Sequence, residues 1–383
     1  MRKYLFLFIF MAMPLIAFAN DVSIDGITYV LDEESKTAEV KSTYEYGTLV
    51  IPETIEYDKM QYTVTSIADL AFYQKNIWCF LIPKTVSKIG LFAFAGLNGF
   101  YNCTIYLLSE TVVFSEANAF KDSRVSSMIL RVPEQLVEDY KSTSPYNEIG
   151  EISALSTRDV VSVIMAYSYD KMQEPLTKGY FVYGEQVTET DMGYPQFMIA
   201  ATELLGDMYP LGTNSGYDWY RSYNTMEKMG SDSRIAHTQW YTLVNYIKMV
   251  NSVIGKVSVY DKSEFWDDVD TKNKWGSMFA LRALFYYMMT VFYEAVENPY
   301  TDCSKVKGLT VPIVTETTEA SALNNNPRAT HREMVDLILH DLDIAEEAIT
   351  AGGVAGGYIG IPVVYGLKAR VYLWDEDYAN AAT

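Results

Sequence analysis

The sequence predicts a two-domain protein, in which a small N-terminal solenoid of short strands and turns precedes a mainly α-helical domain. Its length of 383 residues allows two or three domains. Short motifs recur every 22 to 31 residues in the region 21–155, whereas apolar residues follow helical spacing from position 156 onward. Hydrophobic residues are 49% and charged residues 21% of the chain, which supports packed cores and excludes general disorder.

The first 19 residues read as a signal peptide. Arg2 and Lys3 precede an apolar run at 4–16, and Ala17-Phe18-Ala19 forms a small-x-small cleavage signal. We expect cleavage before Asn20. The apolar run is too short to span a bilayer, as is a second apolar stretch at 278–291. The sequence therefore predicts an exported protein without a transmembrane segment in the mature chain.

The charge balance excludes several classes of partner. Lys and Arg number 30 against 49 Asp and Glu, a net charge of −19. Nucleic acids and anionic lipids both require basic surfaces, so neither is an expected partner. Three histidines and three cysteines make a His-based metal site or a disulfide framework improbable. The 31 tyrosines and six tryptophans supply many rigid amphipathic contact surfaces.

Two repeated signals define the first domain, residues 20–155. The motifs IPET, IPKT, LSET and VPEQ start at positions 51, 82, 108 and 132, and Ala-Phe pairs end at Phe72, Phe94 and Phe120. Matched periods of this length indicate a solenoid in which each coil contributes a short strand and an inward-facing phenylalanine. The spacing also places Cys103 in the core, and its register does not support a disulfide bond with Cys79.

This region resembles a BspA-like leucine-rich repeat domain. The strings DGITYVL at 25, AEV at 38, GTLVIPETI at 47 and YTVTSIADLAF at 62 resemble the opening of such a domain. LIPKTVSKIGLFAF at 81 is similar to its internal repeat, and LRVPEQLVEDYKSTSPYNEI at 130 to its terminal cap. The resemblance covers 21–152 and implies a leucine-rich repeat solenoid, although Ser109 stands where the third repeat would usually have proline.

The second domain, residues 156–383, shows helical periodicity. A helix is expected to start at Ser156 or Thr157, and further helices at 240–257, 275–294 and 362–374. Thr330 and Glu333 form a capping-box pattern at the start of another helix. We assign two apolar stripes, one in the helix at 240–257 and one after position 330: Trp240, Val244, Ile247, Val250, Asn251 and Ile254; Met334, Leu337, Ile338, Leu342, Ala345 and Ile349.

These helices carry a second resemblance. WYTLVNYIKMVNSVIGKV at 240, WGSMFALRALFYYMMTVFY at 275 and GLTVPIV at 308 resemble the SusD/RagB family. PRATHREMVDLILHDLDIAEEAI at 327 and GLKARVYLWDEDYANAA at 366 continue the resemblance in the family order. It implies a helical scaffold with tetratricopeptide-type helix pairs, and a glycan- or nutrient-binding lipoprotein on a TonB-dependent (SusC-like) outer-membrane transporter in Bacteroidota.

The sequence departs from that family in two ways. It lacks the lipid-anchor cysteine near the N-terminus, so a periplasmic or secreted location stays open beside the outer membrane and cell surface. Family members also continue well beyond the helix at 362–374, so we expect only the N-terminal part of a SusD-like domain, apparently truncated. On that interpretation four apolar residues of this helix would lack part of their cover: Val363, Leu367, Val371 and Leu373.

No motif for catalysis, cofactor binding or metal binding is present. The chain has no G-x-G-x-x-G, G-x-x-x-x-G-K-[ST], H-E-x-x-H, C-x-x-C or G-x-S-x-G. We interpret His331 and His340 as solvated helix positions, and the acidic cluster of Asp341, Asp343, Glu346 and Glu347 as the wet face of a helix. A solvated turn or helix start explains Asp267, Asp268 and Asp270 better than a calcium loop does.

One segment carries a binding chemistry. Tyr217, Trp219, Tyr220 and Tyr223 place four rings within seven residues, and Asn214 and Arg221 add hydrogen-bonding groups. Sugar rings stack on aromatic side chains while polar groups bind their hydroxyls, so these six residues form a tentative glycan site. The alternative is that the rings anchor a long loop. Trp240, Trp275 and Arg282 lie in regular apolar stripes and are interpreted as scaffold.

The sequence thus predicts a non-enzymatic protein with no cofactor and no metal. It would bind a glycan or another nutrient and deliver it to a TonB-dependent transporter. The alternative is an adhesion protein whose solenoid binds a host or matrix protein. A glycoside hydrolase is a third possibility for which the sequence offers no motif.

Overall fold

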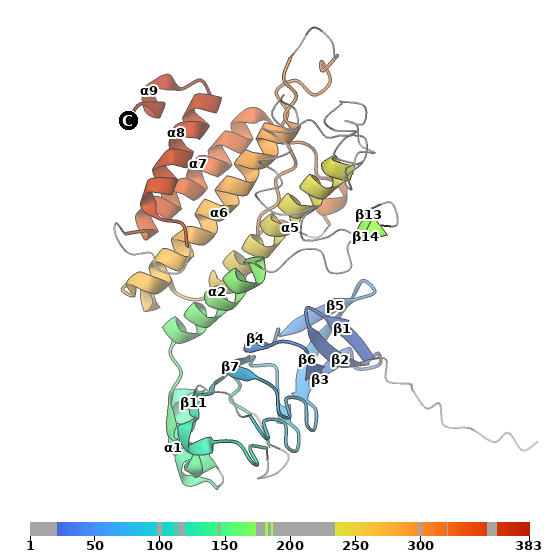
Figure 1. Ribbon diagram of the computed structural model, residues 1–383, viewed down its shortest axis with the longest axis vertical. Coiled ribbons are helices and arrows are strands. Elements are labelled where there is room, and N and C mark those ends of the chain that lie inside the picture. The colour runs from blue at the N-terminus through green and yellow to red at the C-terminus, as the bar shows by residue number, and fades with distance from the viewer. Residues whose placement is uncertain are drawn as a thin grey trace, which may run out of the picture. The chain divides into compact units, whose positions relative to one another are not determined.

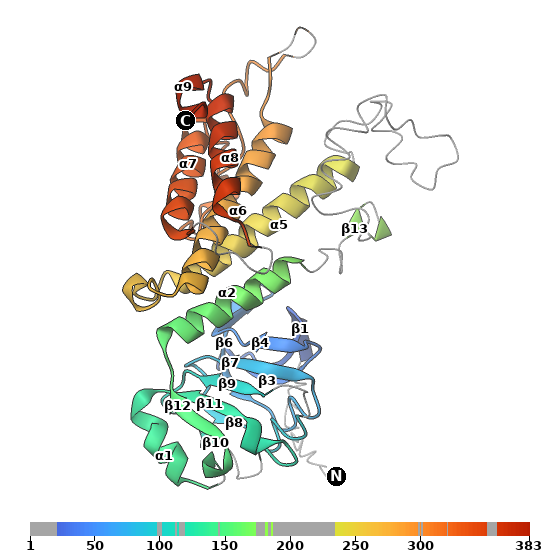
Figure 2. The same cartoon turned by 60° about the vertical axis from the view of Figure 1, so that its left-hand side comes forward.

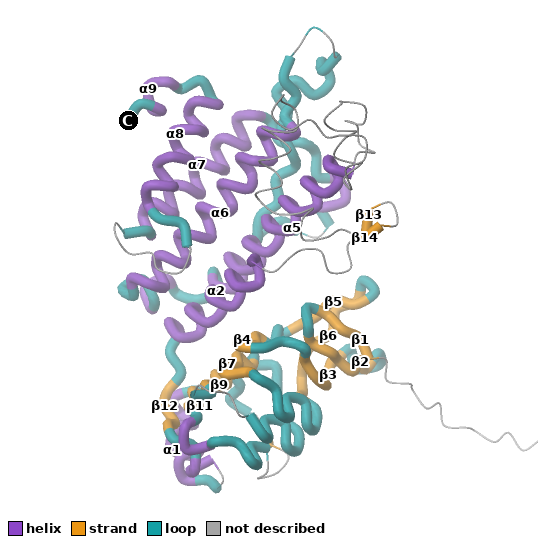
Figure 3. Tube along the Cα trace, in the orientation of Figure 1, coloured by secondary structure: helices purple, strands orange, loops and turns teal. Residues whose placement is uncertain are grey.

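The computed structural model describes residues 21–97, 102–111, 113–114, 119–144, 146–173, 181–182, 185–186, 234–297, 299, 302–319, 321–350 and 358–383. The chain forms two compact units, Met1–Leu155 and Ser156–Thr383 (Figure 1). The first unit consists mostly of strands and the second mostly of helices (Figure 3).

Seven strands form the first sheet of the N-terminal unit. Its order is β1-β2-β3-β6-β8-β10, and β5 pairs with β6. The pairs β1–β2, β2–β3 and β5–β6 are antiparallel, whereas β3–β6, β6–β8 and β8–β10 are parallel. The bounds are β1 (Asp21–Ile24), β2 (Ile27–Asp32), β3 (Thr37–Thr43), β5 (Thr54–Tyr57), β6 (Met60–Ile67), β8 (Lys88–Ile89) and β10 (Val113–Phe114).

The second sheet contains five strands, all parallel, in the order β12-β11-β9-β7-β4 (Figure 2). Between β6 and β11 the chain passes alternately from one sheet to the other, so each strand pairs with one that lies a repeat away in sequence. The bounds are β4 (Gly47–Val50), β7 (Ile77–Ile82), β9 (Thr104–Leu107), β11 (Ile129–Val132) and β12 (Glu151–Ala154), and the short helix α1 (Val137–Ser142) lies between β11 and β12 in the chain.

The interior of this unit is built from matching positions of successive repeats. Leu49, Phe80, Ile105, Leu130 and Ile152 are aligned by the parallel register of the second sheet, and all are buried. Parallel sheets need such apolar rows because packing covers the face that carries them. The short strands that end at each repeated motif therefore owe their stability to this row rather than to their own length.

The three phenylalanines of the Ala-Phe pairs form a column beside that row. Phe72 and Phe94 are fully buried and Phe120 is 5% exposed. The ring centroids of Phe72 and Phe94 are 5.5 Å apart, and those of Phe94 and Phe120 are 5.4 Å apart. The prediction that their spacing places them together in the interior is confirmed, since aromatic pairs at 4.5–7 Å are in favourable contact.

Both cysteines of the first unit are free thiols. Cys103 is buried, as its spacing predicted, and burial raises its pKa to about 12. Cys79 pairs in register with Thr104 rather than with Cys103. Burial raises the pKa of Cys79 to about 11, so neither thiol is a reactive thiolate at neutral pH.

The second unit is a layer of antiparallel and crossing helices. α6 contacts α5 and α7, α7 contacts α8, and α2 contacts α5 and α6. The bounds are α2 (Thr157–Gln173), α5 (Arg234–Val257), α6 (Val269–Tyr293), α7 (His331–Ala348), α8 (Ile361–Trp374) and α9 (Tyr378–Ala381), with a small hairpin of β13 (Phe181–Val182) and β14 (Glu185–Gln186). Among the described residues, no helix combines the length and apolar character that crossing a bilayer requires.

Side-chain caps fix where these helices begin. Thr330 accepts from the Glu333 backbone N–H while Glu333 accepts from the Thr330 backbone, which confirms the capping box. Asp268 accepts from the Thr271 backbone N–H and caps α6, so the acidic run before Trp275 is a helix start, as expected. α6 starts six residues earlier than the apolar pattern suggested, because this cap lies upstream of the first buried ring.

Helix α8 is covered on one side only. Leu367 and Val371 are buried, whereas Val363 and Leu373 are 48% and 53% exposed. The expectation that all four would lack part of their cover is therefore wrong for Leu367 and Val371.

Candidate ligand-binding site

The six residues predicted to bind glycan lie outside the described residues. Asn214, Tyr217, Trp219, Tyr220, Arg221 and Tyr223 all precede α5, whose first residue is Arg234. The described residues that continue this segment are the first turns of α5. These turns of α5 are therefore the described part of the candidate site.

Trp240 presents an aromatic ring in this part of α5. Its side chain is 37% exposed and meets Tyr293, the last residue of α6, edge-to-face with ring centroids 5.0 Å apart and an interplanar angle of 84°. Val244, one turn later, is 38% exposed. Together they form a half-exposed apolar surface at the end of the α5–α6 pair, of the kind that stacks against a sugar ring.

The scaffold interpretation is thus wrong for Trp240 in one respect. Farther along the same stripe Ile247, Val250 and Ile254 are buried, as predicted. Toward the helix N-terminus the buried face is formed instead by Thr238, Gln239, Thr242 and Leu243. The apolar pattern therefore predicted the wrong buried face in this part of α5. Trp275 and Arg282 are 8% and 3% exposed and do belong to the interior.

Gln239, next to Trp240, holds a polar group without a partner. Its side chain is 7% exposed, and among the described residues Nε2 has no hydrogen-bond acceptor. A buried donor left unsatisfied costs about 1–3 kcal/mol. Native proteins keep few such groups, and those they keep call for an explanation. An acceptor oxygen from a ligand would remove this cost, which makes Gln239 a candidate polar contact beside the Trp240 ring.

A buried ion pair fixes the helices behind this surface. Arg282 of α6 donates from Nε and Nη2 to both carboxylate oxygens of Asp341 in α7, at 2.7 and 2.8 Å. Its Nη1 donates to Asn251 Oδ1 at 3.0 Å and to Glu316. A bidentate pair of this kind is both strong and geometrically specific. Burial raises the pKa of the Asp341 carboxyl, and the Arg282 guanidinium opposes that shift.

Asp341 corrects the sequence interpretation of the acidic cluster. Its side chain has no exposed surface, whereas Asp343, Glu346 and Glu347 are solvent-accessible, as expected for a wet face. Asp341 lies three residues after Ile338 and four before Ala345, so it belongs to the apolar stripe of α7. Two sequence signals could have predicted this ion pair: the place of Asp341 in the apolar stripe of α7 and the place of Arg282 in the apolar pattern of α6.

The same network holds the crossover segment that follows α6. Asn251 Nδ2 donates to the Val314 carbonyl at 2.8 Å. The Tyr286 hydroxyl donates to that carbonyl at 2.6 Å and accepts from the Val314 N–H at 2.8 Å. Burial raises the pKa of Tyr286 to about 12, so the phenol stays protonated and can donate. These bonds satisfy backbone groups that an irregular segment would otherwise leave buried and unpaired.

His331 also differs from its predicted solvated position. Nδ1 is 2.9 Å from Glu294 Oε1 and Nε2 is 3.4 Å from Asp375 Oδ1, while the ring lies 4.2 Å from the Trp374 ring. Trp374 Nε1 donates to the second Glu294 oxygen at 2.7 Å. This junction ties the ends of α6 and α8 to the start of α7. In the part of the chain that the structure describes, no three His, Cys, Asp or Glu side chains form a metal-binding group.

The chain belongs to the SusD-like family described as starch-binding and associating with the outer membrane, which matches residues 169–373. A comparison with curated proteins finds no match.

Several solved structures are similar to this chain. A SusD-like carbohydrate-binding protein from Bacteroides vulgatus shares 18% identity and a TM-score of 0.45, covering 59% of this chain and 43% of that one. A laminarin-binding SusD-like protein shares 17% identity and a TM-score of 0.41, with 60% and 42% covered. A SusD superfamily protein from Bacteroides thetaiotaomicron shares 18% identity and a TM-score of 0.41, covering 59% of this chain and 44% of that one. The chain spans less than half the length of these structures.

Proposed function

We propose that this protein binds a glycan at the bacterial cell surface without catalysing a reaction on it. The observation that carries the proposal is membership, over residues 169–373, in a family described as starch-binding and associating with the outer membrane. The composition agrees with it, because aromatic rings abound and the net charge of −19 does not hinder an uncharged ligand.

The binding site in this proposal joins the aromatic segment at 217–223 to the first turns of α5. Trp219 and Trp240 would contribute ring faces, and Gln239 and Asn214 would contribute hydrogen bonds to sugar hydroxyls. The exposure of Trp240 and the unpaired Nε2 of Gln239 support this arrangement. Aromatic walls with a few placed polar groups are the general composition of small-molecule sites.

The proposal extends to location and partner. After export through the signal peptide at 1–19, the protein would sit at the outer membrane and deliver its glycan to a TonB-dependent, SusC-like transporter. The family description supports the outer-membrane location. The transporter follows from the resemblance to SusD/RagB proteins, and a pull-down from outer membranes that recovers no such transporter would remove this part.

For the N-terminal unit we propose a BspA-like leucine-rich repeat solenoid. The parallel register of β4, β7, β9 and β11, the chain's alternation between two sheets and the phenylalanine column support that assignment. The adhesive role considered for such a solenoid has no observation of its own among the described residues.

Isothermal titration calorimetry with soluble starch and laminarin oligosaccharides tests the proposed function. A Trp219→Ala variant should weaken binding by about 1–3 kcal/mol, by analogy with aromatic stacking on other flat ligands. Tyr365→Ala is the matched control, because this ring is 53% exposed on α8. Absence of binding by the wild-type chain across a broad panel of neutral polysaccharides would refute the proposal, and equal loss in both variants would refute the assigned site.

A further inference from the structure

Two neighbouring tyrosines of the N-terminal unit have side chains that are largely exposed to solvent. Tyr44 and Tyr46 are 76% and 74% exposed, the highest values among the large hydrophobic side chains described for this unit. They lie in the short connection between β3 and β4, two residues apart. Isolated exposed rings are common, whereas neighbouring exposed rings on one connection form a patch that calls for an explanation.

The backbone beneath the two rings is held at both ends. The Tyr44 N–H donates to the Gly26 carbonyl at 2.9 Å, and the Gly47 N–H donates to the Asn76 carbonyl at 2.9 Å. Between them, the Glu45 N–H donates to Thr43 Oγ1 at 3.0 Å. The rings are therefore presented by a fixed segment, and little backbone entropy would be lost when a ligand binds them.

Two glycines leave room for the side chains that hold this segment. A Cβ on Gly26 would lie 1.8 Å from Glu45 Oε1, so the Glu45 side chain packs directly over that glycine. A Cβ on Gly47 would lie 3.0 Å from the Trp78 ring. Tyr44 and Tyr46 flank Glu45 in the chain, and their large exposed fractions show that neither ring packs onto the unit as Glu45 does.

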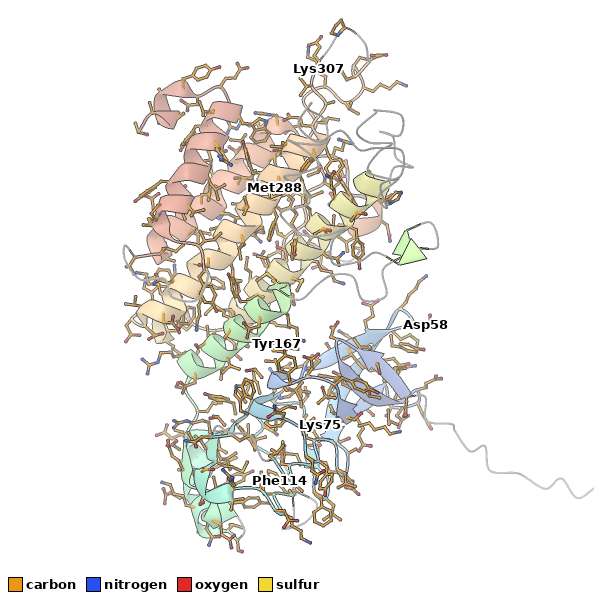
Figure 4. The ribbon with its side chains drawn as sticks, in the orientation of Figure 1. Asp58, Lys75, Phe114, Tyr167, Met288 and Lys307 are labelled. Carbon is orange, nitrogen blue, oxygen red and sulfur yellow. The ribbon has the colours of Figure 1, made fainter. Side chains whose placement is uncertain are left out.

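A neighbouring turn adds polar groups to the same surface. The Lys75 ammonium, labelled in Figure 4, lies 5.9 Å from the centre of the Tyr44 ring. Tyr73, on the same turn, is 45% exposed, and its hydroxyl accepts from Gln74 Nε2 at 3.2 Å. Phe72 anchors this turn in the core, and the Gly47–Asn76 hydrogen bond joins the turn to the Tyr44 segment.

We propose that Tyr44, Tyr46 and Lys75 form a second carbohydrate-binding surface, separate from the site beside α5. Tyrosine offers an apolar face for the C–H side of a sugar ring and a hydroxyl for its polar edge, at low cost in side-chain entropy. The two tyrosines are only two residues apart in the chain, so a single oligosaccharide would contact both rings. The inference rests on the proposed glycan-binding function, to which it adds a second point of attachment.

The charges favour this ligand over other classes. An anionic polymer or membrane would meet a single lysine on a chain with a net charge of −19, which is repulsive overall. A neutral polysaccharide needs neither a basic surface nor a large apolar area.

The test uses the full chain and soluble starch and laminarin as probes, in affinity electrophoresis and calorimetry. We expect Tyr44→Ala/Tyr46→Ala to lower the affinity for a long polysaccharide about tenfold or more, since one stacked ring contributes about a factor of ten. Tyr57→Ala is the control, because this tyrosine is 43% exposed on β5 of the same unit. Thermal melts should be alike for all three proteins.

The outcomes separate this inference from the proposed function. Loss in the double variant with a normal Tyr57→Ala protein supports the second surface. Suppose that the wild type binds and that Trp219→Ala weakens this binding. If the double variant then binds with unchanged affinity, the second surface is overturned and the proposed function stands. A wild type that binds no polysaccharide overturns both. A double variant that alters self-association instead of glycan affinity would show that the tyrosines serve a protein contact, and would also overturn the inference.

Discussion

Arg282 hydrogen-bonds to three side chains inside the helical unit, those of Asn251, Glu316 and Asp341. It is 3% exposed and contacts acceptors on α5, on α7 and on the crossover segment. Desolvating a charge costs several kcal/mol, which only a well-placed counter-charge and complete hydrogen bonding offset. The pair with Asp341 provides both the counter-charge and the hydrogen bonds. We therefore expect removal of one partner to lower the free energy of unfolding more than removal of both.

We expect Arg282→Met to lower the free energy of unfolding by about 3–5 kcal/mol, because Asp341 would stay buried without a counter-charge. The double variant Arg282→Met/Asp341→Leu should be clearly more stable than the single one. Arg332→Met is the control, since Arg332 is 57% exposed and its ion pairs should contribute no more than about 1 kcal/mol. Urea denaturation measures the unfolding free energy of all three variants, and a double variant no more stable than Arg282→Met would contradict the coupling.

Phe94 has the corresponding role in the first unit. Its ring is fully buried and contacts the rings of Phe72, Phe80 and Phe120. Phe94→Ala should cost about 3–5 kcal/mol through lost burial and the cavity it leaves. The control is Tyr73→Ala, at a half-exposed position of a neighbouring turn. A loss below about 1 kcal/mol in chemical denaturation would mean that the ring is not part of a continuous core.

Among the helices, two glycines occupy opposite environments. A Cβ on Gly276 of α6 would lie 2.8 Å from side-chain atoms of Ala348 and Ile349, whereas a Cβ on Gly366 of α8 meets nothing within 4 Å. Gly276 thus permits the close approach of α6 to the end of α7. Among the described residues Gly366 serves no such contact, and as a helix-interior glycine it costs about 0.5–1 kcal/mol relative to alanine.

The same substitution should therefore have opposite signs in the two helices. Gly366→Ala should raise the unfolding free energy by about 0.5–1 kcal/mol, and Gly276→Ala should lower it through overpacking by about 1–3 kcal/mol. Thermal or urea unfolding of the matched pair gives both values. A stabilised Gly276→Ala protein would show that α6 and α7 do not approach as closely as described.

The cap of α7 links helix stability to pH. The Thr330 backbone N–H and hydroxyl donate to Glu333, which lowers the pKa of that carboxyl. A lowered pKa means that the cap contributes stability above the ordinary glutamate range and loses it as the pH falls through the native value. Carboxyl chemical shifts followed by NMR should show Glu333 titrating below an ordinary glutamate, and Thr330→Ala should bring it partly back. Titration of Glu333 at the ordinary value would rule out the capping box.

At the scale of the whole molecule, much of the architecture could be predicted because it repeats. The Ala-Phe spacing placed Phe72, Phe94 and Phe120 in the core, and the 3.6-residue period placed most of the helices. Polar residues in apolar stripes were harder, since Asp341 looks like its exposed neighbours until its partner Arg282 is known. Burial near helix ends was also harder to predict. The exposure of Trp240 depends on which face of α5 the rest of the unit covers there, and the helical period alone does not reveal this.

Export is a prediction about the molecule as a whole. The signal at 1–19 should be removed during export, so the mature protein should begin at Asn20. Intact-mass spectrometry of the protein recovered from the cell envelope or the medium measures this directly. An N-terminus at Met1, or a mass increment corresponding to acyl chains, would contradict it.

The Arg282 network also constrains the order in which the helical unit can form during synthesis. Its partners Asn251, Glu316 and Asp341 are 31, 34 and 59 residues away in the chain. A chain that ends before α7 holds the arginine of α6 with Glu316 but without Asp341, its bidentate counter-charge, so packing α5 and α6 around the guanidinium would leave its burial only partly compensated. We therefore expect α5 and α6 to pack stably only once α7 is available, and until then their apolar faces stay accessible to chaperones.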